Sequence, residues 1–445
     1  MPDRPNVLLI CTDQQFAGAM SCVGNGDVST PAMDRIADQG VLFEEAYCPS
    51  PLCTPSRASM LTGRMPHETG VTDNGIELPE SYHEETLGRL FDGAGYDCAY
   101  AGKWHVPGLD PEAGGFERIC DQNDLDVADE CREYLQRDRE DPFFLVTSFD
   151  DPHNICEWAR DQNLPWGNVS RPPTEECPSL PANYHPPPFE PEAIREEIDQ
   201  NSRTYGAMTG AAPEEWRQYR HAYYRLVERV DGEVGRILDS LDAQGYSKET
   251  VVVFLSDHGD GHGAHRINQK YFLYEEEVRI PFVVAPPEET DSGRVNDGHL
   301  VSTGLDLLPT LCDYADIDPP SGLRGRSVRP VVAGQTPADW RDYLVTQTYV
   351  PLKGRMVRTD RYKYTVYCRG RNREQLFDME RDRGEQVDLS VDAAYEDVLT
   401  AHRERLIQWA AETRDIFAER YPSNAPLVPG YDVQKLQERI ERNEH

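Results

Sequence analysis

Lysine is the residue that this sequence most clearly lacks. It has six lysines beside 39 arginines, and its 45 basic residues face 79 acidic ones, which gives a formal charge of −34. This negative charge disfavours nucleic acid or an anionic membrane as a partner, because both would be repelled. An acidic, lysine-poor surface suits high salt, where screening weakens self-repulsion, so we expect a halophilic source. The alternative is an ordinary acidic protein.

Long hydrophobic runs are also missing. No stretch of about 18 apolar residues occurs, which predicts that no helix spans a membrane. The first residues, MPDRPNVLLIC, have only a short apolar run and predict no signal peptide. We therefore expect a cytoplasmic protein without a membrane partner. The eleven cysteines follow no regular spacing, and in that compartment we expect reduced, mostly buried thiols.

Four apolar runs end in polar residues. They have the composition of buried strands and occupy Asn6–Gln15, Tyr96–His105, Pro142–His153 and Thr250–His262. Helical patterns lie between them, and strands that alternate with helices predict an α/β fold with a large, mostly parallel sheet flanked by helices. Ligands bind outside the carboxyl ends of such strands. We therefore expect the four polar ends to share one crevice.

The length of the chain predicts more than one hydrophobic core. We expect residues 1–330 to form a catalytic α/β domain, with a proline-rich surface excursion at 157–213. After residue 330, short strand-like pieces and a helical pattern from about Ala393 to Glu412 predict a small α+β domain over 331–425. Residues 426–445 are expected to form a charged tail.

Two pairs of possible metal ligands each follow a predicted strand. Asp13 and Gln14 follow the first strand, and Asp257 and His258 follow the last. Each pair alone could simply be a turn. Two carboxylates that are brought together repel each other unless a cation lies between them. Carboxylate and amide oxygens with a histidine suit calcium, magnesium or manganese, so together the pairs predict a divalent metal site.

Cys53 lies where a short helix is expected to begin. Thr54 and Pro55 resemble a helix cap and a first-turn residue, and Gly63 resembles the end. A side chain there meets the free N–H groups and partial positive charge of a helix start, so a thiolate could act as a nucleophile. The alternative is a loop cysteine without a chemical role. Arg57, on the first turn, favours the chemical interpretation.

Several stretches resemble the sulfatase family of the alkaline-phosphatase-like superfamily. CTPSRASMLTGR (Cys53–Arg64) is similar to the first family signature, and GYDCAYAGKWH (Gly95–His105) is similar to the second. TDQQ, SDHGD and HRINQKYFLYEEEVRIPF (His265–Phe282) resemble further blocks in the family order, and RMVRTDRYKY resembles the C-terminal domain. The resemblance implies a sulfuric ester hydrolase that cleaves sulfate monoesters of small molecules or saccharides.

The resemblance also implies a modified nucleophile and a metal. In this family a maturation enzyme converts the signature cysteine, here Cys53, to Cα-formylglycine. Its hydrated aldehyde attacks sulfur with one oxygen and expels sulfate through the other. Asp13, Gln14, Asp257 and His258 would hold a divalent metal together with an oxygen of residue 53. Calcium is the first expectation for this metal, with magnesium and manganese as alternatives.

The same resemblance assigns roles around the sulfate. Arg57 would orient the diol, and Lys103 and Lys270 would bind sulfate oxygens and neutralise charge in the transition state. His105 would be the base that triggers collapse of the sulfated intermediate. His153 would bind sulfate and protonate the leaving alcohol, a task that it could share with Lys270.

The resemblance also concerns His265, and the chain departs from many sulfatases at Gln14 and His258. His265 is expected to line the substrate pocket. Many sulfatases have Asp where this chain has Gln14 and Asn where it has His258, and the variants found here also occur in hydrolases of phosphonate monoesters and phosphodiesters. Such a hydrolase is one alternative. Another is an anion-binding protein in which Cys53 keeps its thiol. Aryl, carbohydrate and small alkyl sulfates all stay open as substrates.

Overall fold

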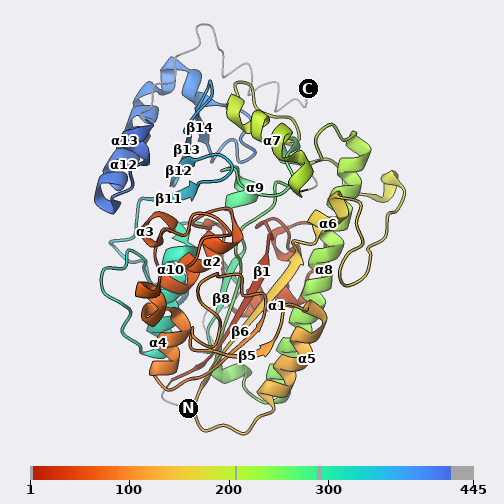
Figure 1. Ribbon diagram of the computed structural model, residues 1–445, viewed down its shortest axis with the longest axis vertical. Coiled ribbons are helices and arrows are strands. Elements are labelled where there is room, and N and C mark those ends of the chain that lie inside the picture. The colour runs from red at the N-terminus through yellow and green to blue at the C-terminus, as the bar shows by residue number, and fades with distance from the viewer. Residues whose placement is uncertain (1–3, 206–207, 288–292, 422–445) are drawn as a thin grey trace.

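A large sheet forms the centre of the computed structural model, which describes residues 4–205, 208–287 and 293–421 (Figure 1). The strands from edge to edge are β5 (Glu117–Cys120), β4 (Asp97–Gly102), β6 (Phe143–Pro152), β1 (Asn6–Asp13), β7 (Thr250–Ser256), β8 (Phe282–Ala285), β2 (Val41–Phe43) and β9 (Arg294–Asn296). Neighbours from β5 to β7 run parallel, and β8 runs antiparallel to both of its neighbours. The predicted α/β fold with a mostly parallel sheet is confirmed.

Both faces of the sheet are buried. In β1, Leu8 and Ile10 belong to one core, whereas Val7, Leu9 and Cys11 belong to the other, because successive strand residues point to opposite faces. The first core is covered by α1 (Pro31–Gln39), α5 (Asp124–Leu135) and α8 (Pro213–Ala243). The second is covered by α2 (Cys53–Thr62), α4 (Leu87–Gly93) and α10 (Thr303–Ala315). This double burial explains why the strands are almost wholly apolar.

The predicted excursion at 157–213 is more ordered than its sequence indicates. It contains α7 (Glu192–Tyr205). Ala193 and Ile194 of this helix have no exposed surface and belong to the second core. The predicted surface excursion therefore contains a helix that packs partly against the core. Acidic and amide residues surround the few apolar positions of α7, which hides the helical pattern in the sequence. The other short elements are β3 (Ala46–Tyr47), β10 (Val301–Ser302), α3 (Pro66–Thr69), α6 (Ile155–Ala159), α9 (Glu275–Val278) and α11 (Arg329–Val332).

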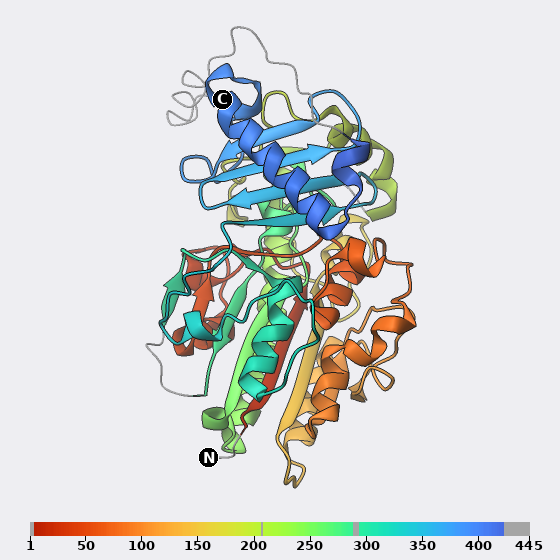
Figure 2. The same ribbon diagram turned by 90° about the vertical axis from the view of Figure 1, so that its left-hand side faces the viewer.

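The C-terminal part is a separate antiparallel sheet with its own core. Its strands follow chain order as β11 (Tyr343–Thr348), β12 (Gly354–Thr359), β13 (Tyr362–Tyr367) and β14 (Glu374–Asp378). The helix α12 (Glu396–Thr413) lies across this sheet and is followed by α13 (Phe417–Arg420) (Figure 2). The predicted α+β domain is present. The predicted tail at 426–445 lies outside the described residues. None of the described helices combines the length and hydrophobicity needed to cross a bilayer.

Candidate active site

The polar ends of the central strands meet the start of α2. In β1 and its two parallel neighbours, Asp13 pairs with Pro152, and Thr12 pairs with Ser256. The strands therefore end at one level. Cys53 is the first residue of α2, and its Sγ lies 3.8 Å from Asp13 Oδ1. Chain segments more than 200 residues apart thus meet at the carboxyl end of the sheet, where ligands bind in this class of fold.

Cys53 is buried among charged groups. Its Sγ lies 3.1 Å from Lys270 Nζ and 3.3 Å from His258 Nε2. Burial and the charge of Asp13 both act to raise the pKa of the thiol. The cations of Lys270, His258 and Lys103 outweigh them, so that the pKa of Cys53 falls well below its usual range.

Lys270 is a buried cation that contacts no carboxylate of the described residues. Its side chain is 1% exposed, and among the described residues no carboxylate oxygen lies within 4.0 Å of its Nζ. Its hydrogen-bond partner is the Cys53 sulfur. Because a buried charge is costly unless it is compensated, this ammonium group is arranged to meet an anion at residue 53.

Four buried side chains bring their possible ligand atoms within 4.8 Å of one another: Asp13, Cys53, Asp257 and His258. Gln14 lies beside them, with positive φ, and its Nε2 donates to Asp260 Oδ2 at 2.7 Å. The other end of this side chain, Oε1, is buried and accepts no hydrogen bond from the part of the chain that the structure describes. Two carboxylates, one imidazole and an unsatisfied amide oxygen fit a divalent cation, so these residues fit the predicted metal set.

Arg57 holds the two carboxylates in place. Its Nε donates to Asp257 Oδ2 at 2.8 Å, and its Nη2 donates to Asp13 Oδ2 at 3.2 Å. The remaining Nη1 donates to the Lys103 carbonyl at 2.9 Å and to Ser148 Oγ at 2.8 Å. The guanidinium is buried, so its charge reduces the repulsion between the carboxylates at low screening.

The pKa values of Asp13 and Asp257 are shifted in opposite directions. Burial, followed by the charge of Asp13, raises the pKa of Asp257 to about 6. For Asp13 burial acts in the same direction, but neighbouring cations, of which Lys103 is the strongest, hold its pKa well below the usual range. Lys103 Nζ lies 2.7 Å from Asp13 Oδ2 and 2.6 Å from Asp150 Oδ1. Lys103 is therefore fixed between two carboxylates at the edge of the site.

The two predicted histidines lie on the partly open side of the site. His153 is half-buried, and burial together with the charges of Lys270 and Lys103 lowers its pKa well below the usual value. Its ring is therefore neutral at pH 7. His105 has positive φ, and its carbonyl accepts a hydrogen bond from Thr54 Oγ1 at 3.0 Å. This bond ties the His105 segment to the first turn of α2.

His265 lies apart from the residues around Cys53. Its side chain has no exposed surface, and its ring stacks on Tyr274 with 4.1 Å between the ring centroids. With Glu276 and Glu385 it forms a second group of possible metal ligands, but Lys363 Nζ already lies 2.8 Å from Glu385 Oε1. The ring is thus packed among its own neighbours, and the expectation that His265 lines the substrate pocket stays a prediction.

Sequence reasoning missed residues that position the predicted ones. Asp150 contacts Lys103, Ser148 contacts Arg57, and Asp260 holds the Gln14 side chain. Asn74 Oδ1 accepts the backbone N–H of Thr54 at 3.1 Å. Asp260 belongs to the SDHGD stretch and could have been noticed there. The others carry no local signal, because each acts on a group that is distant in the sequence.

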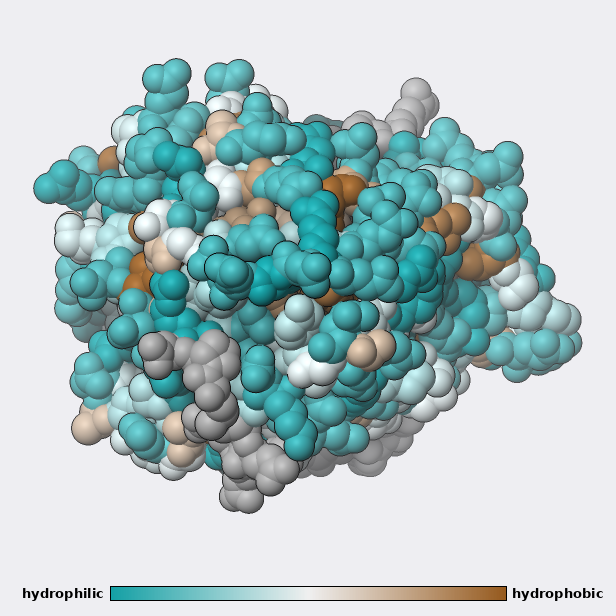
Figure 3. Space-filling model, turned by 90° about the horizontal axis from the view of Figure 1, so that it is seen from below, coloured by the Kyte–Doolittle hydropathy of each residue, from teal (hydrophilic) through white to brown (hydrophobic). Residues whose placement is uncertain are grey.

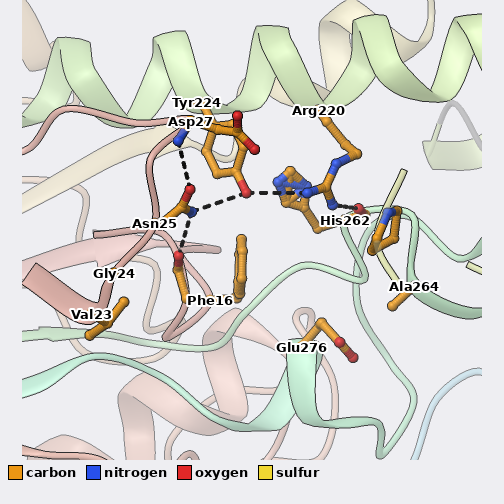
Figure 4. Close-up of a pocket in the computed structure, with 12 residues that line it drawn as sticks. Phe16, Val23, Gly24, Asn25, Asp27, Arg220, Tyr224, His262, Ala264 and Glu276 are labelled. Atoms are coloured by element: carbon orange, nitrogen blue, oxygen red, sulfur yellow. Dashed lines mark hydrogen bonds between the residues drawn. The ribbon is translucent and has the colours of Figure 1, made fainter. Parts of the chain in front are cut away.

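A separate hollow of about 320 Å³ lies between α8 and the loop that follows β1 (Figure 4). The buried His262 ring is enclosed there by the rings of Phe16, Tyr223 and Tyr224, with centroids 4.6 to 4.8 Å away. Arg220 also lines it and donates to the His262 carbonyl at 2.9 Å. None of the predicted site residues lines this hollow.

A buried nucleophile beside two carboxylates, a histidine and a lysine ammonium suits the hydrolysis of anionic esters. The comparisons with known proteins identify the kind. The family model described as sulfatase matches residues 5–317, and that of the C-terminal part of N-sulphoglucosamine sulphohydrolase matches residues 263–412. The chain therefore belongs to the sulfatase family within the alkaline-phosphatase-like superfamily, and it is a sulfuric ester hydrolase.

Three similar proteins illustrate this relation. A delta 4,5-hexuronate-2-O-sulfatase of Bacteroides thetaiotaomicron is 31% identical, over 99% of this chain and 97% of that protein. The structure of a 2-O GAG sulfatase is 29% identical with a TM-score of 0.83, over 98% of this chain and 100% of the other. The phosphonate monoester hydrolase of Agrobacterium radiobacter is 23% identical with a TM-score of 0.76, over 94% and 97% of the two chains, and shares the fold.

Proposed function

We propose that the protein is a formylglycine- and metal-dependent sulfatase that hydrolyses sulfate monoesters of saccharides. The observation that carries this proposal is the buried ammonium of Lys270, which faces residue 53 and has no carboxylate partner within 4.0 Å among the described residues. An incoming sulfate would supply the missing negative charge. The saccharide part rests on the names of the relatives, which act on sulfated sugars.

Each side chain near residue 53 has a role in this reaction. Once Cys53 is converted, its hydrated aldehyde supplies the oxygen that attacks sulfur and a second oxygen through which the residue returns to the aldehyde. Lys103 and Lys270 hold the sulfate oxygens as point charges. The neutral ring of His153 donates a hydrogen bond to the ester, and the ammonium group of Lys270 supplies the proton of the leaving alcohol. His105 accepts the proton that residue 53 releases.

Asp13, Gln14, Asp257 and His258 would hold the metal, as their donor atoms suit calcium, magnesium or manganese. A bound divalent cation polarises the sulfate and lowers the pKa of the diol. Arg57 keeps both carboxylates ionised and oriented toward one another.

The first experiment is the mass of the tryptic peptide that ends at Arg57, from protein made in its native host. Conversion of a cysteine thiol to an aldehyde changes this mass, and a maturation enzyme is required for it. Turnover of an aryl sulfate is then compared with that of an aryl phosphonate monoester. We expect the converted peptide and a preference for the sulfate. An intact thiol with no turnover would favour the anion-binding alternative, and a strong phosphonate preference would favour the phosphonate hydrolase.

Metal removal provides a second test. Dialysis against a chelator should abolish aryl sulfate turnover, and readdition of calcium, magnesium or manganese one at a time identifies the metal by which activity returns. Circular dichroism should show that the metal-free protein keeps its fold, because Arg57 still pairs with Asp13 and Asp257. Full activity in the metal-free protein would contradict the proposed metal role.

Two statements about the source are also proposals. We propose a halophilic host, supported by the formal charge of −34, by the six lysines and by the largely hydrophilic surface visible in Figure 3. Loss of structure in low-salt buffer would agree with it, and indifference to salt would contradict it. We propose a cytoplasmic location, which is tested by fractionating host cells and following the sulfatase activity.

A further inference from the structure

A pocket of about 280 Å³ opens where the catalytic domain meets the C-terminal sheet. Its walls come from α3, from the turn after α3, from the connection between β11 and β12, and from the junction of α12 and α13. We call it the interdomain pocket. It is separate from the hollow of Figure 4, with which it shares no lining residue.

The interdomain pocket carries uncompensated positive charge. Lys353, Arg414 and Arg420 line it with exposed side chains, and none lies within 4.0 Å of a carboxylate oxygen of the described residues. The lining carboxylate, Asp415, is bound by Arg355 through contacts of 2.6 and 3.0 Å. In a chain with a formal charge of −34, three free cations around one pocket provide a local attraction for anions.

One side of the pocket is apolar. The Arg355 guanidinium lies 4.6 Å from the ring centroids of both Tyr349 and Phe417, and Ile416 is 51% exposed. Arginine donors match the geometry of carboxylate or sulfate oxygens, while aromatic and aliphatic surface packs against C–H groups. The combination fits a sugar ring with an acidic substituent better than it fits a free inorganic ion.

Both walls continue along the chain into segments that contact neighbours of the catalytic residues. Thr72 lies two residues, or at most about 7 Å of extended chain, before Asn74, which holds the backbone of Thr54 next to Cys53. On the other wall Tyr349 follows Thr348, whose hydroxyl donates to the Tyr271 carbonyl at 2.7 Å, next to Lys270. Both walls of the pocket are therefore continuous along the chain with segments that contact the neighbours of Cys53 and Lys270.

We propose that the interdomain pocket binds a second anionic group of the substrate, a carboxylate or another sulfate on the sugar that carries the scissile ester. This rests on the proposed sulfatase function and names its substrate class, a polyanionic sulfated saccharide. The hollow of Figure 4 does not offer such a site, because Asp27 and Glu276 line it beside Arg220.

The test compares three probes on the matured full-length protein: a sulfated uronic acid, a hexose with two sulfates and the matching neutral monosulfated hexose. We expect the first two to have at least tenfold higher kcat/KM than the third. The Arg414→Gln/Arg420→Gln double variant should lower this acidic-to-neutral ratio at least tenfold. The control, Arg381→Gln, removes an exposed and unpaired arginine outside the pocket and should keep the ratio. Thermal unfolding checks that both variants fold.

The results distinguish a failure of the pocket proposal from a failure of the proposed sulfatase function. A ratio near one in the wild type, or a high ratio that the double variant retains, overturns the pocket proposal while turnover of the neutral ester still supports the sulfatase. Absence of turnover with all three esters, in protein whose peptide mass shows conversion of Cys53, overturns the proposed function instead. Comparison of the two acidic probes tells whether the pocket recognises a carboxylate or a second sulfate. Higher salt should lower the wild-type ratio, because screening weakens charge-based recognition.

Discussion

Two buried groups of charges in this protein use similar residues in different ways. The first surrounds Cys53 and contains Asp13, Arg57, Lys103, Asp257 and Lys270. The second, which we call the domain-junction cluster, joins α9 to the C-terminal sheet. In it Lys363 Nζ lies 3.0 Å from Glu275 Oε1 and 2.8 Å from Glu385 Oε1. Arg358 Nη2 lies 2.7 Å from Glu45 Oε2.

The difference lies in whether the charges are satisfied within the protein. Each cation of the domain-junction cluster meets a carboxylate, and Lys363 holds the pKa of Glu275 at about 2 against the opposing effect of burial. In the catalytic cluster, Lys270 contacts the sulfur of Cys53 instead of a carboxylate, and the Gln14 Oε1 atom accepts no hydrogen bond from the described residues. The domain-junction cluster pairs its cations with carboxylates of the protein and stabilises the junction between domains. The catalytic cluster is complete only when a substrate and a metal are bound.

The largest expected effect is the loss of catalysis without a loss of fold. Cys53→Ala removes the nucleophile, so turnover of an aryl sulfate should fall by about 10³-fold or more. The melting temperature should stay close to that of the wild type, since the surrounding ion pairs of Arg57 remain. Cys22→Ala, at an exposed cysteine, is the matched control and should keep full activity. Turnover above one hundredth of the wild-type rate would contradict the role of Cys53.

The opposite effect is expected in the domain-junction cluster. Lys363→Met leaves Glu275 and Glu385 buried without their shared cation, which should reduce the free energy of unfolding by about 3–5 kcal/mol. Denaturant titration measures this loss, while kcat of the folded fraction should stay near the wild-type value. Lys248→Met, at an exposed lysine, should change stability by no more than about 0.5 kcal/mol. Equal stability of the two variants would show that the cluster does not hold the junction together.

A smaller effect tests whether the catalytic cluster needs a point charge. Lys103→Arg keeps the charge, but a planar guanidinium cannot take the place of an ammonium held 2.6–2.7 Å from two carboxylates. We expect kcat/KM for an aryl sulfate to fall by about 30- to 100-fold, equivalent to about 2–3 kcal/mol. Lys248→Arg is the control for the exchange itself. Wild-type kinetics in the Lys103 variant would refute the assignment.

The smallest effect concerns a buried acid outside both clusters. Burial raises the pKa of Asp388 to about 7, and its Oδ2 has no hydrogen-bond partner among the residues that the structure describes. Because the folded state binds more protons than the unfolded state between about pH 4 and 7, stability should fall as the pH rises through this range.

Asp388→Asn removes this ionisation but keeps an acceptor for the backbone N–H groups of Leu376 and Ser390. The loss of unfolding free energy between pH 5 and pH 8 should shrink by on the order of 1–3 kcal/mol. Asp392→Asn, at a half-exposed capping position, is the control. An unchanged pH slope in the Asp388 variant would contradict the effect of burial.

Local patterns in the sequence predicted much of the fold and part of the site. The apolar runs predicted strands that the structure places in β1, β4, β6 and β7, and the rule that ligands bind at strand ends brought Asp13 and Asp257 together. The helix α7 within residues 157–213 was harder to predict, because it buries few apolar residues among many acidic ones. His265 was placed in the substrate pocket by resemblance, but its neighbours in space, such as Tyr274 and Glu385, enclose it.

The sequence by itself determined which apolar runs form buried strands, where the helix near Cys53 begins and which residue types surround it, because these depend on neighbours along the chain. Tertiary structure alone decided that Lys103 meets Asp150 and that Lys270 has no carboxylate partner among the described residues. It also decided that Lys353, Arg414 and Arg420 line one pocket. The reason is that charge compensation depends on distance in space, and at low dielectric a few ångströms decide whether a cation is paired or available.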